Sequence, residues 1–73
     1  MGNNSKVITV SINGEPRQLP ANMAIASLID EMGLTGKRIA LERNGEIVPR
    51  STFTTQSLSA GDKLEIVVAV GGG

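Results

Sequence analysis

Leu64-Glu65-Ile66-Val67-Val68-Ala69-Val70 is the stretch that decides the fold, and Gly71-Gly72-Gly73 follows it directly. One face of this strand carries Leu64, Ile66, Val68 and Val70, and the other carries Glu65, Val67 and Ala69. A strand this apolar suits the middle of a sheet, where its main-chain groups are hydrogen-bonded on both edges. We therefore expect a central last strand that holds the glycine tail at its origin.

The tail is the first candidate for chemistry, because Gly73 offers a carboxylate without a Cβ to obstruct a narrow channel or an attack on the carbonyl. If the three glycines are extended, this carboxylate projects on the order of 10 Å beyond Val70, at about 3.3 Å per residue. The alternative interpretation is a frayed terminus or an appended linker. The rest of the chain must decide between the two.

The N-terminal segment predicts a hairpin. Lys6 to Ile12 alternates apolar and polar residues with the period of a half-buried strand. Asn13-Gly14 favours the positive φ angles of a type I′ turn. Glu15 to Leu19 then returns as a second strand, which Pro16 marks as an edge strand.

The period changes to that of a helix between Met23 and Met32, where the apolar stripe consists of Ile25, Leu28, Ile29 and Met32. Asn22 is the expected N-cap and Gly33 the expected residue after the C-cap. Asp30 and Glu31 stand in the last turn, where negative charge opposes the helix dipole. They form either a solvated face or a contact with a partner.

The remaining segments predict a second hairpin and a crossing loop. They are a strand at Ile39 to Arg43, a turn at Asn44-Gly45, a strand at Glu46-Ile47-Val48 that Pro49 ends, a polar segment at Ser51 to Ser59, and a turn at Ala60-Gly61-Asp62. Phe53 and Leu58 are the expected anchors of the polar segment on the core. The predicted order of elements is β-β-α-β-β-β.

This order predicts an α+β, β-grasp (ubiquitin-like) fold, with a mixed sheet of four to five strands, one packed helix and a flexible C-terminal glycine tail. In this fold the C-terminal strand inserts beside the first strand. We expect a disordered N-terminal extension at 1–5, the β-grasp domain at 6–70 and the flexible tail at 71–73.

Composition excludes several classes of function. The 73 residues are 40% hydrophobic with Phe53 as the only aromatic residue, which predicts a thin aliphatic core. Seven basic residues balance seven acidic ones, so the net charge provides no general electrostatic attraction for nucleic acid or an anionic membrane. Cysteine and histidine are absent, which excludes disulfides, thiolate metal sites and Cys-based catalysis. The chain is therefore not expected to be an enzyme itself. No apolar run approaches the roughly 18 residues of a membrane span, and residues 1–6 lack a signal-peptide core, so we expect a cytoplasmic protein.

Four short motifs carry a family resemblance. They are Ile12-Asn13-Gly14-Glu15, Ile47-Val48-Pro49-Arg50-Ser51, Ala60-Gly61-Asp62 and the terminal Gly71-Gly72-Gly73. In this order and at this length, the chain resembles the ThiS family of sulfur carriers in thiamine biosynthesis. It departs from the family in the additional Met1-Gly2-Asn3-Asn4-Ser5 ahead of the first strand.

The resemblance implies a sulfur-transfer cycle on Gly73. An E1-like ATP-dependent adenylating enzyme activates the carboxylate, a sulfur donor such as a cysteine desulfurase or rhodanese-type protein supplies sulfur, and thiazole synthase consumes the resulting thiocarboxylate. ATP and Mg²⁺ belong to the activating partner, so no cofactor is expected on this chain. Gly72 matches the family's penultimate glycine, whereas Gly71 matches a position that varies.

Docking of such partners requires more than the tail, because ordering each flexible glycine costs about 1–2 kcal/mol. We expect an apolar patch of Val67 and Ala69 with nearby Val7, and with Arg43 or Arg50 at its rim. The alternative is that these residues merely cover the sheet. Arg50 is expected to hold a carboxylate, either within the fold or on a partner.

Three other functions remain open. The small subunit of molybdopterin synthase resembles this fold and also ends in Gly-Gly, with a different recipient for the sulfur. A ubiquitin-like modifier would join Gly73 to a lysine. A plain β-grasp binding module would leave the glycines without a role, although zero net charge and the lack of exposed aromatic residues argue against RNA as its ligand.

Overall fold

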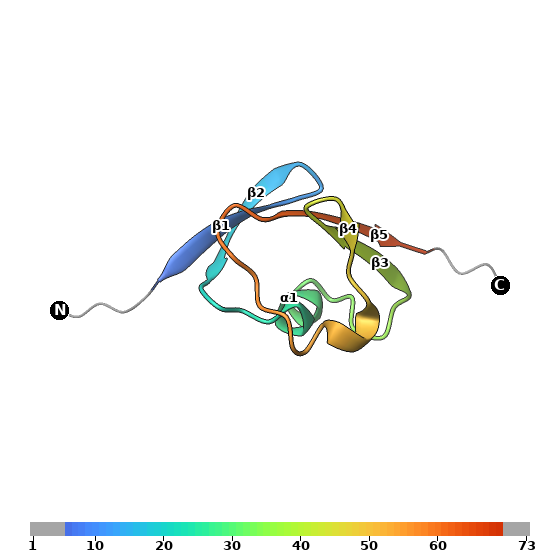
Figure 1. Ribbon diagram of the computed structural model, residues 1–73. Helices are drawn as coiled ribbons and strands as arrows, with labels where there is room; N and C mark the ends of the chain where they lie inside the picture. Colours follow the sequence, from blue (N-terminus) through green and yellow to red (C-terminus); the bar gives the residue numbers. More distant parts are fainter. Residues whose placement is uncertain (1–5, 70–73) are drawn as a thin grey trace.

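The computed structural model describes residues 6–69, so the expected extension (1–5), Val70 and the tail (71–73) lie outside the described residues. Its elements are β1 (Val7–Ile12), β2 (Glu15–Pro20), α1 (Ile25–Glu31), β3 (Ile39–Arg43), β4 (Glu46–Ile47), the 3₁₀ turn η1 (Arg50–Thr52) and β5 (Lys63–Val68) (Figure 1). The predicted β-β-α-β-β-β order is confirmed. The turn η1 was not predicted.

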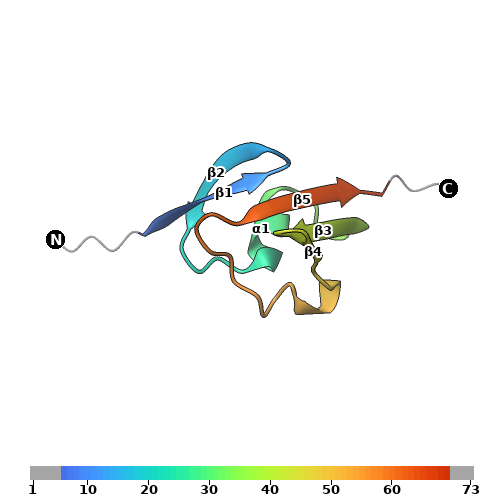
Figure 2. The same cartoon turned by 45° about the horizontal axis from the view of Figure 1, so that its top comes forward.

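The strands form one mixed sheet in the order β2-β1-β5-β3-β4. β5 runs parallel to β1 and antiparallel to β3, and both hairpins are antiparallel. Figure 2 shows β5 lying between the two hairpins. The prediction that the last strand is central and lies beside the first is therefore confirmed.

Both hairpin turns have the backbone that the Asn-Gly pairs predict. Asn13 and Gly14 have φ angles of 52° and 86°, and Asn44 and Gly45 have φ angles of 53° and 87°. Positive φ at two successive residues matches the right-handed twist of the flanking strands. The turns therefore fix the register of each hairpin.

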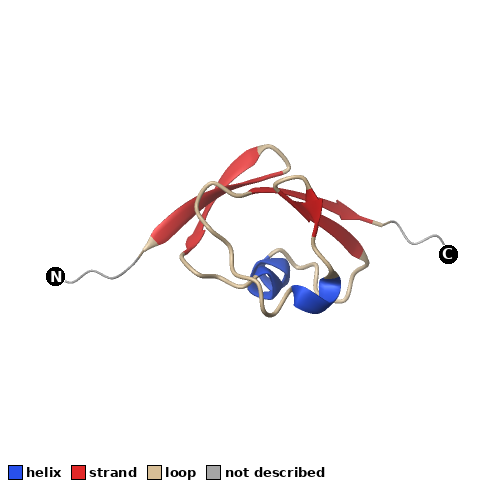
Figure 3. Cartoon of the chain, viewed as in Figure 1, coloured by secondary structure: helices blue, strands red, loops and turns tan. Residues whose placement is uncertain are grey.

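The helix α1 lies on one face of the sheet together with η1 (Figure 3). Its end is as predicted: Gly33 has φ 74°, and the Gly33 and Leu34 N–H groups donate to the Asp30 and Ile29 carbonyls at 3.0 Å. This pair of bonds is a Schellman motif, which satisfies carbonyls that the helix leaves free.

The predicted helix start is wrong. The N-cap is Ala24 and Asn22 adopts a turn conformation with φ 65°. A capping side chain is unnecessary because the crossing segment supplies the acceptors: the Ile25 and Ala26 N–H groups donate to the Gln56 and Phe53 carbonyls at 3.0 and 2.9 Å.

The core lies between the helix and the sheet. Its buried members are Val10, Ile12, Leu19, Ile25, Leu28, Ile29, Leu41, Val48, Phe53, Leu58, Leu64 and Ile66. The predicted anchors Phe53 and Leu58 are 8% and 2% exposed. Only aliphatic groups and one phenyl ring fill this core, as the composition indicated.

Candidate functional site

β5 is the element that carries the tail, and its N-terminal half is hydrogen-bonded on both edges. On one side it pairs with all of β3, from Arg43 opposite Leu64 to Ile39 opposite Val68. On the other side it pairs with the end of β1, where Ile12 lies opposite Leu64. The Ala69 N–H, at the last described residue, still donates to the Arg38 carbonyl at 2.8 Å. The tail therefore leaves the body from a fixed point.

Asn13 extends this pairing by one step with its side chain. Its main-chain N–H donates to the Leu64 carbonyl at 2.9 Å. Its side-chain Oδ1 accepts from the Ile66 N–H at 2.8 Å, and its Nδ2 donates to the Ile66 carbonyl at 3.2 Å. The amide thus replaces one strand residue beside β5. The Asn-Gly motif predicts the turn but contains no signal for this second role.

The face of β5 that points away from the helix is exposed and apolar toward the tail. Val67 is 63% exposed and lies opposite Ala40 of β3. Ala69 follows on the same face, and Ile47 of β4, 65% exposed, lies one strand further along the sheet. We name Ala40, Ile47, Val67 and Ala69 the outer patch.

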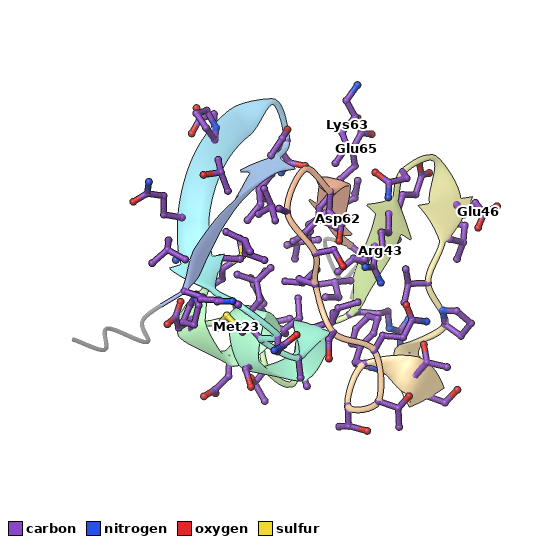
Figure 4. All side chains as sticks on the ribbon, turned by 60° about the vertical axis from the view of Figure 1, so that its left-hand side comes forward. Met23, Arg43, Glu46, Asp62, Lys63 and Glu65 are labelled. Atoms are coloured by element: carbon purple, nitrogen blue, oxygen red, sulfur yellow. The ribbon has the colours of Figure 1, made fainter. Side chains whose placement is uncertain are left out.

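Carboxylates interrupt the outer patch. Glu42 and Glu65 lie directly opposite each other in the β3–β5 pair. Like charges in this position weaken a sheet by roughly 0.2–1 kcal/mol. Figure 4 shows Lys63 and Glu65 projecting from the face of β5 opposite the helix. Glu42 and Glu65 therefore form an acidic border next to Ala40 and Val67 of the outer patch.

Val7 does not belong to the outer patch, and the expectation that it lies near Val67 is wrong. It is 57% exposed. Ser11 pairs with Lys63 in the parallel register, so Val7 lies four residues before this pair and Val67 four residues after it. At about 3.3 Å per residue the two valines are separated by on the order of 26 Å. Figure 1 shows the start of β1 and the end of β5 at opposite ends of the molecule.

Arg43 also lies elsewhere than expected. Its Nη2 is 2.8 Å from Asp62 Oδ2, its Nε donates to the same oxygen at 3.0 Å, and its Nη1 donates to Gln56 Oε1 at 3.1 Å. Figure 4 shows Arg43 and Asp62 pointing toward each other. Arg43 therefore holds the turn before β5 against β3 and does not border the outer patch.

Asp62 is the centre of this network. Besides Arg43, it accepts hydrogen bonds from the Ser59 N–H at 2.8 Å and from Asn44 Nδ2 at 3.1 Å. Burial acts to raise the pKa of Asp62, but the hydrogen bonds from Ser59, Asn44 and Arg43 and the charge of Arg43 together hold its pKa below the ordinary value. The network fixes the point at which β5 begins.

Arg50 lies on the helix side of the sheet. Its Nη2 donates to the Lys37 carbonyl at 3.1 Å, so it holds a main-chain oxygen within the fold and not a carboxylate. Together with Ile39 and Phe53 it lines a shallow pocket of about 160 Å³. Arg50 is therefore not at the rim of the outer patch.

The two acids at the end of α1 have partners within the chain. Asp30 Oδ1 accepts from the Thr35 hydroxyl at 3.1 Å, and Glu31 forms an exposed ion pair with Arg17 at 3.5 Å. Such pairs contribute little to stability. Their local contacts agree with a solvated face.

Residues 6–69 contain no group of three or more acidic side chains placed to hold a metal ion. In the same range, no helix has the length and hydropathy needed to cross a bilayer.

A five-stranded mixed sheet with its C-terminal strand in the centre and one helix across it defines a β-grasp protein, here with a glycine tail after the central strand. The chain belongs to the ThiS family, whose model matches residues 10–73. The resemblance seen in the sequence is thereby confirmed.

Individual relatives agree with this assignment. The chain is 47% identical over 62 residues to a thiazole synthase from Paramagnetospirillum magneticum, a match that covers 85% of this chain and 19% of that protein. The chain therefore spans about a fifth of that relative. It is 33% identical to the uncharacterized protein ycf40 of Porphyra purpurea, over 94% of this chain and 97% of that protein.

A solved structure supports the fold. The crystal structure of the thiamine biosynthesis protein ThiS from Geobacter metallireducens superposes with a TM-score of 0.77 at 23% identity, over 90% of this chain and all of that chain. The predicted β-grasp architecture is thus confirmed.

Proposed function

We propose that this chain is a sulfur carrier for thiazole formation in thiamine biosynthesis, with Gly73 as the carrier group. The observation that supports this most directly is the position of β5. The strand is anchored in the middle of the sheet and is followed within a few residues by Gly71-Gly72-Gly73. Membership of the ThiS family supports the proposal.

The chemistry begins with a carboxylate, which is a poor electrophile until it carries a good leaving group. A carboxylate oxygen of Gly73 attacks the α-phosphorus of ATP and displaces pyrophosphate, which gives an acyl adenylate. A sulfur nucleophile then attacks the acyl carbon and AMP departs. With hydrosulfide as the nucleophile, the product is the thiocarboxylate.

The chain's own composition supports the terminus as the site that carries the sulfur. It has no cysteine that could hold sulfur as a persulfide. ATP and Mg²⁺ act in an E1-like ATP-dependent adenylating enzyme, and the sulfur comes from a donor such as a cysteine desulfurase or rhodanese-type protein. The carrier itself contributes a reachable carboxylate and a surface for docking.

Thiazole synthase is the proposed recipient of the sulfur. The match to the Paramagnetospirillum magneticum protein supports this choice, since a segment similar to this chain forms part of a longer protein that is called a thiazole synthase. Joining a carrier to the enzyme that it supplies raises their effective concentration.

The test is intact-mass spectrometry after incubation with ATP, Mg²⁺, sulfide and the adenylating enzyme of the same organism. We expect the mass change of an oxygen-to-sulfur exchange, confined to chains with the complete tail. A variant lacking Gly72 and Gly73 is the matched control, because its described body is unchanged. No exchange, with a known carrier converted alongside, would reject the proposal.

The recipient is tested in a second step. The thiocarboxylate form is incubated with thiazole synthase and its other substrates, and the return of the carboxylate mass is followed. Consumption by molybdopterin synthase instead would identify the alternative carrier. A covalent product with a lysine would identify a ubiquitin-like modifier.

A further inference from the structure

The second half of β5 has one open edge. Asn44 N–H donates to the Lys63 carbonyl and Ala69 N–H donates to the Arg38 carbonyl, so the odd-numbered residues of β5 direct their main-chain groups toward β3. Leu64 and Ile66 bond to Asn13 on the opposite edge. By this alternation, the N–H and C=O of Val68 point to the side of β1.

Nothing in residues 6–69 lies opposite Val68 on that side. The pairing of β1 with β5 ends at Ile12 and Leu64, and the chain then turns away at Asn13-Gly14. The Asn13 side chain reaches as far as Ile66. Beyond this point β5 continues with β3 as its only neighbour among the described residues.

The other edges of the sheet are protected against pairing, and this one is not. The edge strand β2 contains Pro16 and Pro20, and β4 is only two residues long and is followed by Val48 and Pro49. Prolines and short strands are the usual means of preventing a sheet edge from adding a foreign strand. The open part of β5 has neither.

The sequence at this edge is that of a strand covered on both faces. Val67, Val68 and Ala69 are all apolar, although Val67 and Val68 point to opposite faces and are 63% and 40% exposed. Continuous apolar runs are typical of strands buried on both faces, whereas half-exposed strands alternate. The end of β5 therefore has the sequence of a covered strand, although its valine side chains are partly exposed in this chain.

We propose that the adenylating enzyme supplies the missing neighbour as an extended segment that adds to the open edge at Val68. This inference rests on the proposed function, since the enzyme must act on Gly73, five residues beyond Val68 and within on the order of 17 Å of it. Strand addition supplies main-chain hydrogen bonds for affinity and holds the tail extended toward the enzyme. Val67 and Ala69 of the outer patch lie on the strand that carries this edge, whereas Ala40 and Ile47 lie on β3 and β4, on the other side of β5.

The test uses amide-to-ester replacement in the chemically synthesised 73-residue chain. An ester in place of the Val68 amide removes the free N–H and keeps the side chain. The matched control is an ester at Val67, whose N–H faces Ala40 of β3. We expect the Val68 ester to bind the adenylating enzyme roughly five- to tenfold more weakly, as for one lost hydrogen bond. Its stability should fall only slightly, because the Val67 carbonyl that faces β3 is kept as a weaker acceptor. The Val67 ester should lose stability instead.

Hydrogen exchange of the unmodified chain gives an independent measurement. The Val68 amide should exchange much faster than those of Val67 and Ala69 in the free chain, and should become at least roughly tenfold slower in the complex, whose pairing protects it. Unchanged exchange of Val68 in the complex, together with equal affinity of the Val68 ester, would overturn the proposal. So would protection that appears on raising the concentration of the free chain, because it would identify a second copy as the occupant.

The same samples separate this inference from the proposed function. If the chain is converted to the thiocarboxylate but Val68 remains unprotected, only strand addition is rejected. If the chain neither binds the enzyme nor is converted, both proposals are rejected.

Discussion

At the scale of single residues, Asn13 performs two tasks that are usually divided between two residues. It adopts the positive φ of the turn and completes the edge of β5 with its side-chain amide. Glycine can adopt this backbone conformation but has no side-chain amide. Alanine lacks the amide as well and is strained in this conformation. Substitutions at this one position can therefore measure the two contributions separately.

We expect Asn13→Gly to lower the free energy of unfolding by about 1–2 kcal/mol, from the loss of two hydrogen bonds to Ile66. Asn13→Ala should cost roughly 1–2 kcal/mol more, because a Cβ is strained in the left-handed region. Urea unfolding measures both values. Equal stability of the glycine variant and the unmodified chain would show that the side-chain bonds contribute no more than the backbone strain that glycine relieves.

Asp62 predicts a pH dependence of stability. Its pKa is lowered below the ordinary value of 3.8 in the folded chain, so the unfolded chain binds its proton first as the pH falls. The contribution to stability is therefore complete above about pH 4 to 5 and is lost as the pH falls through the folded pKa. Urea unfolding between about pH 6 and pH 2.5 measures this loss.

Asp62→Asn is the comparison for that experiment. It leaves Arg43 without its charged partner and should cost about 1.5–3 kcal/mol near neutral pH. Because asparagine does not titrate, the variant should lose less stability than the unmodified chain on acidification. Parallel pH profiles of the two proteins would contradict the assignment of this acid sensitivity to Asp62.

At the scale of elements, what the sequence predicts well is what depends on neighbours in the chain. Strand periods, both Asn-Gly turns and the glycine after α1 are local patterns, and the structure has them as expected. The helix start was missed because its acceptors, the carbonyls of Phe53 and Gln56, come from a distant segment. No local pattern around Asn22 contains that information.

The candidate docking residues show the same difference between features that depend on local sequence and features that depend on pairing with distant segments. Val67 and Ala69 follow from alternation along one strand, and the structure places both on the exposed face. The distance between Val7 and Val67 depends on the parallel register of β1 and β5, which neither strand encodes alone. Arg43 is different: it lies two residues after buried Leu41 and so on the same face of β3, which means that its inward position could have been predicted from the sequence.

The two valines give a matched pair for testing the outer patch. They share side chain, exposure and outward position, at 57% for Val7 and 63% for Val67, but lie at opposite ends of the sheet. We expect Val67→Asp to weaken binding to the adenylating enzyme at least roughly tenfold and Val7→Asp to leave it unchanged. Calorimetric titration of both variants measures the difference.

A further variant separates apolar contact from charge at this position. Val67→Lys should also weaken binding if the lost apolar area is responsible, whereas it should bind well if the Val67→Asp change acts only by adding negative charge near Glu65. Equal affinities of the Val67→Asp and Val7→Asp variants would remove the outer patch from the docking surface.

At the scale of the whole molecule, the proposed function assigns different tasks to the body of the chain and to the terminal group that is proposed to react. Hydrogen bonds from β3, β1 and Asn13 fix β5, and the Arg43–Asp62 network fixes the turn that precedes it. These contacts together set the direction of β5 within the sheet. Under the proposed function, the catalytic groups belong to the partner enzymes.

This separation predicts that the tail can be altered without effect on the body. One alanine added after Gly73 should abolish thiocarboxylate formation, because the reacting carboxylate moves about 3.3 Å further along the channel and acquires a Cβ. Stability against urea should stay the same. Docking of the body should be retained, so this variant should inhibit conversion of the unmodified chain when added in excess.

Substitutions within the tail refine the prediction. Gly72→Ala places a methyl group beside the reacting residue and should slow conversion at least roughly tenfold, whereas Gly71→Ala, one residue further from the carboxylate, should remain near the unmodified rate. Initial rates of oxygen-to-sulfur exchange at saturating enzyme compare the two. Equal slowing by both would indicate that the narrow part of the adenylating enzyme's channel encloses Gly71 as well.

The chain extended by alanine provides the stricter test. If it is converted as well as the unmodified chain, the terminal carboxylate is not the group that reacts, and the carrier function would have to be abandoned for a binding role of the body.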